Sequence, residues 1–590
     1  MRKMWRQNRT TLKRLKHPTL HHCQVLRWRK MRKTTTHHSF SCHSHQVKVF
    51  LNRRAIFVLV YDASQDLQLP SKVEEAYGHE KTKSRYCDFT GLDFLHYWLQ
   101  SIYAYAVPIP KKKKEEKVET KQPHCTPPVF VVGTHRDSLL PDRTDMTENQ
   151  QHQTIYSAIE GKPYQKHVLR QFHMVENSLS NKTDPKLVDL RRHIAEVALK
   201  EPYMGEKIPL RWLQFEKAII EAVSNNTTHM HIQKVRDLAK SFKIRDNREF
   251  STMLQFFHDL GCIVYFGRDK RGRHNQALRD IVVLDPQWLI DVFKRIITVK
   301  PDCRQWSTFC NLWQRLRDDG ILEEELIDHV WEDLKGLKPT FISLMEMFDL
   351  LCPQYIPTKD DKKTKETKFY YVPACLQPGK ETKQRSGVDA DEDATFYVDF
   401  EEFLPDGLFH RVLVHFARWS QEDGHHPPKL HYRHGTFYVG AQKNRHIIEL
   451  CMRPSNPACI KVTVRRPTVV SKHRKREAHR QASPEMCSQV QRKLDNILDI
   501  VKQTWIHGIQ YSFKVLCEGC CNPDQEDSSR LHLLCFHECT HADIDSIFCP
   551  RSESNVETEI YRKRFKISDC QTKETNNDQS KDGNGNISYT

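Results

Sequence analysis

At residues 129–137 the chain reads Val-Phe-Val-Val-Gly-Thr-His-Arg-Asp, an apolar run that breaks into a polar loop ending in a carboxylate. Such a run is typical of a buried parallel strand, which delivers the residues after it to the carboxyl edge of a sheet. Residues 54–62 form a second apolar, β-branched run and predict another buried strand. Between the two runs, the apolar residues of 91–106 recur at helical spacing. Strand, helix and strand make a βαβ unit, so this part of the chain is predicted to be an α/β domain.

The polar loop after the second strand resembles the base-recognition loop of Ras-like GTPases. In those proteins the final carboxylate, here Asp137, accepts two N–H donors of guanine in a charge-assisted pairing. The resemblance implies that Thr134, His135 and Asp137 contact the base of GTP or GDP. The matching phosphate-binding motif is absent, because the first glycine is Gly78 and no Gly-Lys-Ser/Thr occurs in the sequence. Since phosphate contacts supply most nucleotide affinity and almost all GTPase catalysis, we expect weak GTP or GDP binding and assign no catalytic residue.

Basic residues are concentrated at one end of the chain. The 590 residues carry a formal net charge of +17, yet residues 1–61 hold 15 Lys and Arg and no acidic residue. The remainder has 77 of the 92 basic residues against 75 acidic ones, so its charge is nearly balanced and nucleic acid is not an expected partner. We interpret residues 1–44 as a basic arm or a gene-model artefact, with the fold beginning near residue 45.

The cysteines and the hydropathy pattern indicate the compartment. The 19 cysteines are mostly scattered, which suits reduced thiols better than a disulfide framework. No run of about 18 apolar residues occurs, so no transmembrane segment is predicted. The expected location is the cytoplasm.

Residues 208–300 predict helices followed by a two-stranded wing. A helical stripe at 212–223 is followed by polar helical segments, by a helix that stops at Gly261, and by strands at 262–266 and 281–284. This order is typical of a winged-helix module, which binds DNA or serves in packing and dimerisation. The nearly balanced charge favours the second use.

Several blocks agree in order and spacing with one family. The chain resembles a Roco protein, in which a Ras-like Roc domain precedes a COR domain, and it is most similar to animal Roco proteins of the malignant-fibrous-histiocytoma-amplified type. The blocks are residues 50–60, 133–137, 280–289, 370–373 and 403–411. The phosphate loop, the switch segments and the leucine-rich repeats of that family have no counterpart here.

The resemblance implies a multidomain α/β and α+β architecture. Its first domain is a partial Ras-like P-loop NTPase fold without the phosphate loop, and a winged-helix COR-A and an α+β COR-B follow. The predicted divisions are a basic arm at 1–44, a partial Roc domain at 45–203, COR-A at 204–356, COR-B at 369–468, a helix plus Cys/His-rich region at 487–550, and a disordered tail at 551–590. The resemblance also implies homodimerisation through COR and protein signalling partners.

The C-terminal region is rich in cysteine and histidine. Cys517 and Cys520 have the Cys-x2-Cys spacing of one half of a tetrahedral zinc site, and Cys535 and Cys539 are the predicted second half. From Cys535 to His541 the Cys and His residues alternate at a spacing of two, which on a strand would place them on one face. The alternative is a set of reduced, partly buried cysteines that bind no metal.

Three functional hypotheses follow. The first is a cytosolic signalling scaffold that dimerises through COR and does not hydrolyse GTP. The second is a GTP-binding switch whose phosphate-binding half is missing from this sequence. The third is a zinc-binding or nucleic-acid-binding winged-helix protein.

Overall fold

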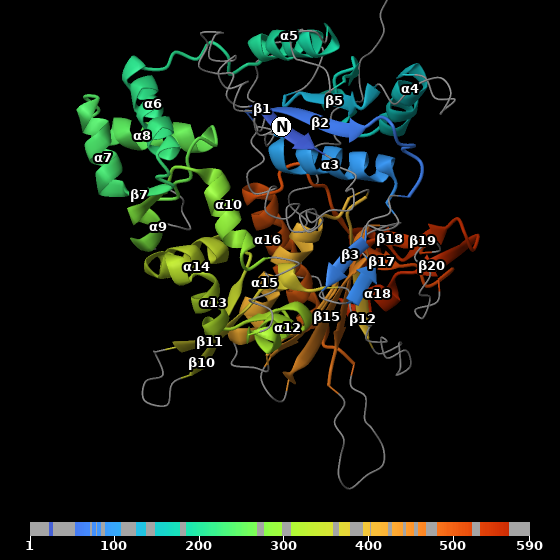
Figure 1. Cartoon of the computed structure of the whole chain (residues 1–590). Coiled ribbons are helices and arrows are strands. Elements are labelled where there is room, and N and C mark those ends of the chain that lie inside the picture. Colours follow the sequence, from blue (N-terminus) through green and yellow to red (C-terminus); the bar gives the residue numbers. More distant parts are fainter. Residues whose placement is uncertain are drawn as a thin grey trace, which may run out of the picture.

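The computed structural model describes most of the chain between residues 54 and 565 (Figure 1). The described residues are 54–70, 89–107, 126–136, 148–176, 185–267, 276–297, 308–357, 365–377, 393–401, 403–422, 427–440, 444–453, 458–467, 481–521 and 531–565, and the backbone of strands β1 (Cys23–Arg27), β3 (Glu74–Tyr77) and β4 (Glu80–Lys83). Among them, no helix has the length and apolar character needed to cross a bilayer.

The first domain is a parallel four-stranded sheet between two helical layers. The strands follow the order β1-β2-β5-β6, with β2 (Ile56–Asp62), β5 (Val129–Thr134) and β6 (His173–Met174). Helices α3 (Gly91–Ala106) and α5 (Pro185–Lys200) lie on opposite sides of the sheet (Figure 1), and α4 (Glu148–Ile159) lies near its end. Alternate residues of β2 point to the two sides, since Phe57 and Leu59 share a core with α3 whereas Val58 and Val60 share one with α5. The predicted βαβ unit is therefore confirmed.

The sheet begins further upstream than the sequence predicted. Strand β1 lies inside the segment that we interpreted as a basic arm, and it pairs in parallel with β2 from Cys23 opposite Ile56 to Arg27 opposite Val60. The five residues of β1 follow two histidines, and their only adjacent aliphatic residues are Val25 and Leu26, so they show no apolar run. Their pairing depends on the long-range contact with β2, which no local pattern predicts.

Residues 208–348 form a largely helical region with two cores. The first core joins α6 (Leu210–Ser224), α7 (Ile232–Ser241) and α8 (Asn247–Asp259) to β8 (Ile281–Val283), which pairs antiparallel with β7 (His229–His231). The second core joins the later elements of the region. These are α10 (Pro286–Lys294), α12 (Cys310–Asp318), β9 (Ile321–Leu322), α13 (Glu324–Val330) and α14 (Lys338–Met347), with the short helices α9 (Gln276–Asp280) and η6 (Glu332–Leu337) beside them.

The start of α10 shows how the sequence sets these boundaries. Asp285 caps the helix, because its carboxylate accepts the N–H of Gln287 at 3.0 Å. Pro286 occupies the first turn, where its missing N–H costs nothing. The predicted strand at 262–266 is reduced to one bridge between Val264 and Val283.

The remainder of the chain is built on a seven-stranded antiparallel sheet of order β13-β14-β15-β16-β12-β17-β18. Helices α15 (Asp406–Glu422) and α16 (Pro484–Thr504) pack on it. Its strands are β12 (Ala394–Asp399), β13 (Lys429–His431), β14 (His434–Val439), β15 (His446–Arg453), β16 (Cys459–Arg465), β17 (Ser512–Leu516) and β18 (Leu533–Cys535). A smaller sheet of β10 (Cys352–Pro357), β11 (Lys365–Tyr371) and β9 precedes it, with η7 (Pro373–Cys375) at its end.

This sheet joins two segments that the sequence analysis had separated at residues 468 and 487. Strand β17 pairs with β12, and Val490, Leu494 and Ile497 of α16 are buried in the core of the sheet. Order also continues past residue 551, through the hairpin of β19 (Ser546–Cys549) and β20 (Ser554–Glu557) and the helix α18 (Glu559–Arg564). The segment after residue 551 is anchored by apolar residues that are isolated among polar ones. Residues 566–590 lie outside the described part.

Helix α3 is shared between the first domain and the seven-stranded sheet. Its apolar residues belong to the same core cluster as β12, α15 and α16. The Tyr97 ring meets the Phe403 ring edge-on at 6.1 Å, and Gly508 donates its N–H to Ala104 O at 3.0 Å. The two units are therefore packed as one body through α3.

Candidate functional site

The loop predicted to read guanine begins at the end of β5. Thr134 is buried, and its hydroxyl donates to Tyr61 O at 3.0 Å. His135 is exposed and takes a left-handed conformation with φ of 61°. Arg136 forms an ion pair with Glu148. Asp137 lies outside the described residues, so among the three residues predicted to contact guanine only His135 is described with an exposed side chain.

Gly133 permits the close packing beneath this loop. A Cβ there would lie 3.1 Å from the Tyr61 ring and 3.2 Å from Ala63 Cβ, which is tighter than ordinary contact. The adjacent backbone is held by Ala63 N–H donating to Thr134 O at 2.9 Å and by Gln151 Nε2 donating to Ala63 O at 2.6 Å. The backbone at Ala63, after β2, and at Thr134, at the end of β5, is therefore held in place beside the loop.

Two histidines, His173 of β6 and His193 of α5, lie beside the strand that carries this loop, with His173 buried and His193 partly buried. His173 Nε2 and His193 Nδ1 are hydrogen-bonded at 2.8 Å, and both rings pack near Phe130. Burial, reinforced by the positive charge that His193 would carry, lowers the pKa of His173 to about 4. His173 is therefore neutral at physiological pH.

We expect this pair to make the first domain acid-sensitive. An unfolded chain protonates His173 near its ordinary pKa of 6.5, whereas the folded chain does so near 4. The unfolded state therefore holds more protons between these values, and stability present above pH 6.5 is lost as the pH falls towards 4, by at most about 3 kcal/mol. Denaturant titrations at several pH values should show this slope, and His173→Gln should flatten it. Equal slopes in the two proteins would contradict the expectation.

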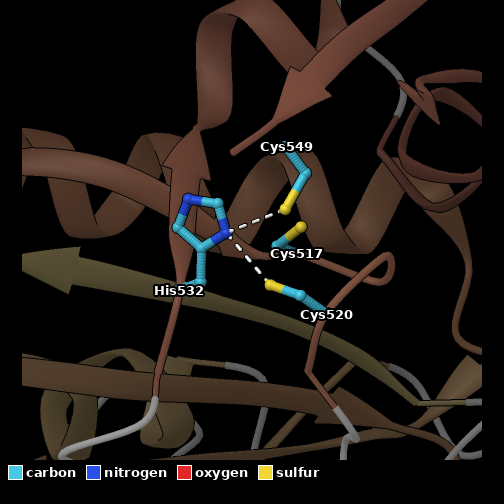
Figure 2. A group of neighbouring side chains, drawn as sticks. All are labelled: Cys517, Cys520, His532 and Cys549. Atoms are coloured by element: carbon cyan, nitrogen blue, oxygen red, sulfur yellow. Dashed lines mark hydrogen bonds between the residues drawn. The ribbon is translucent and has the colours of Figure 1, made fainter. Parts of the chain in front are cut away.

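A second candidate lies in the C-terminal region, where three thiols and an imidazole converge. We call Cys517, Cys520, His532 and Cys549 the Cys3His cluster, and their ligand atoms all lie within 4.8 Å of one another (Figure 2). His532 Nδ1 is 3.1 Å from Cys520 Sγ and 3.4 Å from Cys549 Sγ. Cys517 and Cys549 are fully buried, and the other two are partly buried.

Three strand ends bring these residues together. Cys517 follows β17 and His532 precedes β18, and because the two strands are antiparallel these positions are adjacent. The N–H of Cys517 donates to His532 O at 2.9 Å. Cys549 is the last residue of β19. The cluster thus sits where the edge of the seven-stranded sheet meets the C-terminal hairpin.

Backbone hydrogen bonds favour the thiolate form of Cys517 and Cys549, although burial still raises the pKa of Cys517, and burial with neighbouring thiols raises the pKa of Cys520. Gly519 N–H donates to Cys517 Sγ, and the N–H groups of Arg551 and Ser552 donate to Cys549 Sγ together with the Ser552 hydroxyl. Burial acts to raise the pKa of Cys549, but these hydrogen bonds outweigh it and lower the pKa to about 6. The thiolate is the form of cysteine that binds metals.

The structure changes the predicted set of four cysteines. Cys517 and Cys520 are in the cluster, whereas Cys535 and Cys539 are not. The predicted alternation from Cys535 to His541 does not form, because β18 ends at Cys535 and helix α17 (Phe536–Thr540) begins at the next residue. His532 and Cys549 occupy the two positions of the cluster that were predicted for Cys535 and Cys539.

Known proteins are similar to parts of this chain. Residues 209–376 match the family described as C-terminal of Roc, COR-A domain. Cyclic GMP-binding protein C of Dictyostelium discoideum is 24% identical over 256 residues, which cover 41% of this chain and 9% of that protein. The probable serine/threonine-protein kinase pats1 of the same organism is 23% identical over 319 residues, which cover 52% of this chain and 9% of pats1. The chain therefore spans about a tenth of the length of these curated relatives.

Among solved structures, the chain is similar to the RocCORdC part of Methanosarcina barkeri Roco2 bound to GDP. The likeness has a TM-score of 0.33 and 16% sequence identity, and it covers 57% of this chain and 77% of that one.

The COR-A match falls on the helical region with two cores, so this region of the chain is a COR-A domain. The similarity to these relatives extends over about half of the chain, beyond the COR-A region itself.

Proposed function

We propose that this chain is a cytoplasmic Roco-type signalling protein that acts as a scaffold by homodimerising through its COR region, and that it does not hydrolyse GTP. The observation that supports this most directly is the hydrophobic core that α3 shares with α15 and α16. Helix α3 packs on β2 and β5, so the guanine-recognition end of the Roc domain is joined to COR through contiguous side chains.

The proposal also includes a fold for the region between β7 and β8 and a type of Roco protein. We assign the β7-α7-α8-β8 region a winged-helix fold used for packing, since its helices enclose a core with β8 and the body of the chain has nearly balanced charge. From the sequence blocks, we also propose that the chain is most similar to animal Roco proteins of the malignant-fibrous-histiocytoma-amplified type.

A guanine-nucleotide switch is the second candidate. It is favoured by the exposed His135 at the end of β5, in a loop whose sequence matches the base-recognition pattern. Against it stands the sequence itself, which contains no Gly-Lys-Ser/Thr to bind phosphates.

Two measurements on the purified chain separate these candidates. Titration with fluorescent GTP and Mg²⁺ should give no saturation below about 1 mM, whereas a Kd of about 1 μM or tighter would favour the switch. Light scattering should give twice the 69.8 kDa of one chain. A mass of one chain at all concentrations would contradict the dimerising scaffold.

We expect Gly508→Ala to loosen the contact between the Roc and COR regions. A Cβ at this position would lie 2.4 Å from Tyr103 O, a backbone atom that cannot yield without moving α3. Overpacking of this kind costs about 1–3 kcal/mol. Hydrogen exchange in α3 should become faster, while exchange in α13 and α14 should not change.

Gly336→Ala is the matched control for this substitution, because a Cβ there would meet no atom within 4 Å. If both variants exchange like the wild type, the close approach at Gly508 does not hold the two regions together.

A further inference from the structure

The Cys3His cluster has the donor set of a closed metal site. Three thiolates and one imidazole satisfy the four-coordinate tetrahedral preference of Zn²⁺ in structural sites, with no position left for substrate. Sulfur and nitrogen atoms arranged tetrahedrally around Zn²⁺ lie roughly 3.5–3.8 Å apart. The two distances from His532 Nδ1 to sulfur, 3.1 and 3.4 Å, are close to that value before any ion draws the ligands into place.

The turn that carries Cys517 and Cys520 is shaped for this role. Gly519 directs its N–H to Cys517 Sγ, and a Cβ on Gly519 would lie only 2.7 Å from a methyl group of Val556. The glycine therefore lets the turn approach strand β20 closely. On the opposite side, Cys549 receives N–H groups from the turn that follows it. Two turns thus present sulfur with hydrogen bonds that stabilise it as a ligand.

The C-terminal hairpin has little hydrophobic core of its own. Of the eight residues in β19 and β20, only Cys549 and Val556 are buried. An isolated two-stranded hairpin is marginally stable in water. Tyr561 of α18 connects this end to the sheet, since its hydroxyl donates to Leu516 O at 2.8 Å and accepts the N–H of Glu518 at 3.1 Å. A bond between Cys549 and the other cluster residues would fasten the hairpin directly.

We infer that the Cys3His cluster binds one structural Zn²⁺ that fastens the β19–β20 hairpin and α18 to the β17–β18 edge of the COR sheet. Zinc is preferred over harder cations because sulfur and imidazole nitrogen are soft and borderline ligands. The inference does not rest on the proposed scaffold function, because it is argued from the geometry of the four cluster residues alone.

The full chain, expressed with zinc and purified without chelator, tests this inference by elemental analysis. We expect about one zinc per chain. Cys549→Ser and His532→Ala should each reduce zinc to background, whereas Cys535→Ser should retain it. Cys535 is the matched control because it lies only three residues after His532, at the end of β18, but outside the cluster. Loss of zinc from Cys535→Ser with retention in His532→Ala would overturn the assigned ligands.

A second measurement needs no substitution, so it holds even if a variant fails to fold. Cysteine alkylation read by mass spectrometry should spare Cys517, Cys520 and Cys549 in the wild type. Chelation should expose all three to alkylation and leave the reactivity of Cys535 unchanged. Hydrogen exchange in residues 546–564 should become about tenfold faster or more on chelation, with β14 and β15 unaffected. No stoichiometric zinc, or a disulfide between two cluster cysteines in the purified protein, would overturn the inference.

Discussion

Arg418→Met is expected to destabilise the chain by about 3–5 kcal/mol, because it removes the partner of a buried carboxylate. Arg418 lies on α15 of the COR sheet, and its Nη1 donates to Asp349 Oδ1 at 2.8 Å. Its Nη2 donates to Glu346 O at 3.0 Å, so one guanidinium joins α15 to the end of the helical COR-A region. Asp349 is buried, with 8% of its side chain exposed.

The neighbouring side chains keep the buried Asp349 carboxylate ionised. Burial alone would raise the pKa of Asp349, but the neighbouring His415 and Arg418 outweigh burial and lower the pKa to about 2. A lowered pKa on an acid contributes stability above the ordinary value of 3.8, and this stability is lost as the pH falls towards 2. Without Arg418 the buried charge keeps only His415, whose Nε2 lies 3.4 Å from Oδ2.

Denaturant unfolding followed by hydrogen exchange in α14 and α15 measures the effect. Adding Asp349→Asn to Arg418→Met should recover most of the loss, because no unpaired charge then remains and asparagine tolerates the positive φ of 53° at this position. Arg192→Met is the control, since it breaks an exposed pair with Asp189 and should leave stability nearly unchanged. Equal effects of Arg418→Met and Arg192→Met would mean that the joint between the helical region and the seven-stranded sheet does not depend on the Arg418–Asp349 pair.

Local patterns in the sequence predict the elements that carry their own signal. The apolar runs at 54–62 and 129–137 become β2 and β5, and the helical spacing in 91–106 becomes α3. The two strands are marked by continuous apolar runs and the helix by its 3.6-residue spacing, and each element buries the side chains that its pattern marks.

Features that depend on distant partners could not be predicted in this way. The pairing of β17 with β12 brings together residues more than a hundred positions apart, so α16 was predicted as a helix but not as a cover of the COR sheet. The Cys3His cluster shows the same limit. Cys517 and Cys520 carry a local spacing signal, whereas His532 and Cys549 reach them only because of how β17, β18 and β19 end.

Phe396→Ala should cost about 3–5 kcal/mol, which makes it one of the most damaging single substitutions in the COR sheet. Phe396 lies in β12 and is fully buried. Its ring contacts those of Phe513, Phe536 and Phe565, with centroids 6.0, 6.1 and 6.0 Å away. These neighbours come from β17, α17 and the last described residue, so the substitution opens a cavity where three parts of the chain meet.

The position of this cavity predicts which elements lose their protection from hydrogen exchange. Hydrogen exchange should become faster in β17 and in residues 559–564, while β13 and β14 at the far edge of the sheet should keep their protection. Phe548→Ala is the matched control, because this phenylalanine of β19 is 61% exposed and its removal should change stability by about 0.5 kcal/mol or less. Uniform loss of protection across all seven strands would mean that the sheet opens as one cooperative unit. Loss confined to residues 559–564 would mean that Phe396 anchors the C-terminal helix without supporting the sheet.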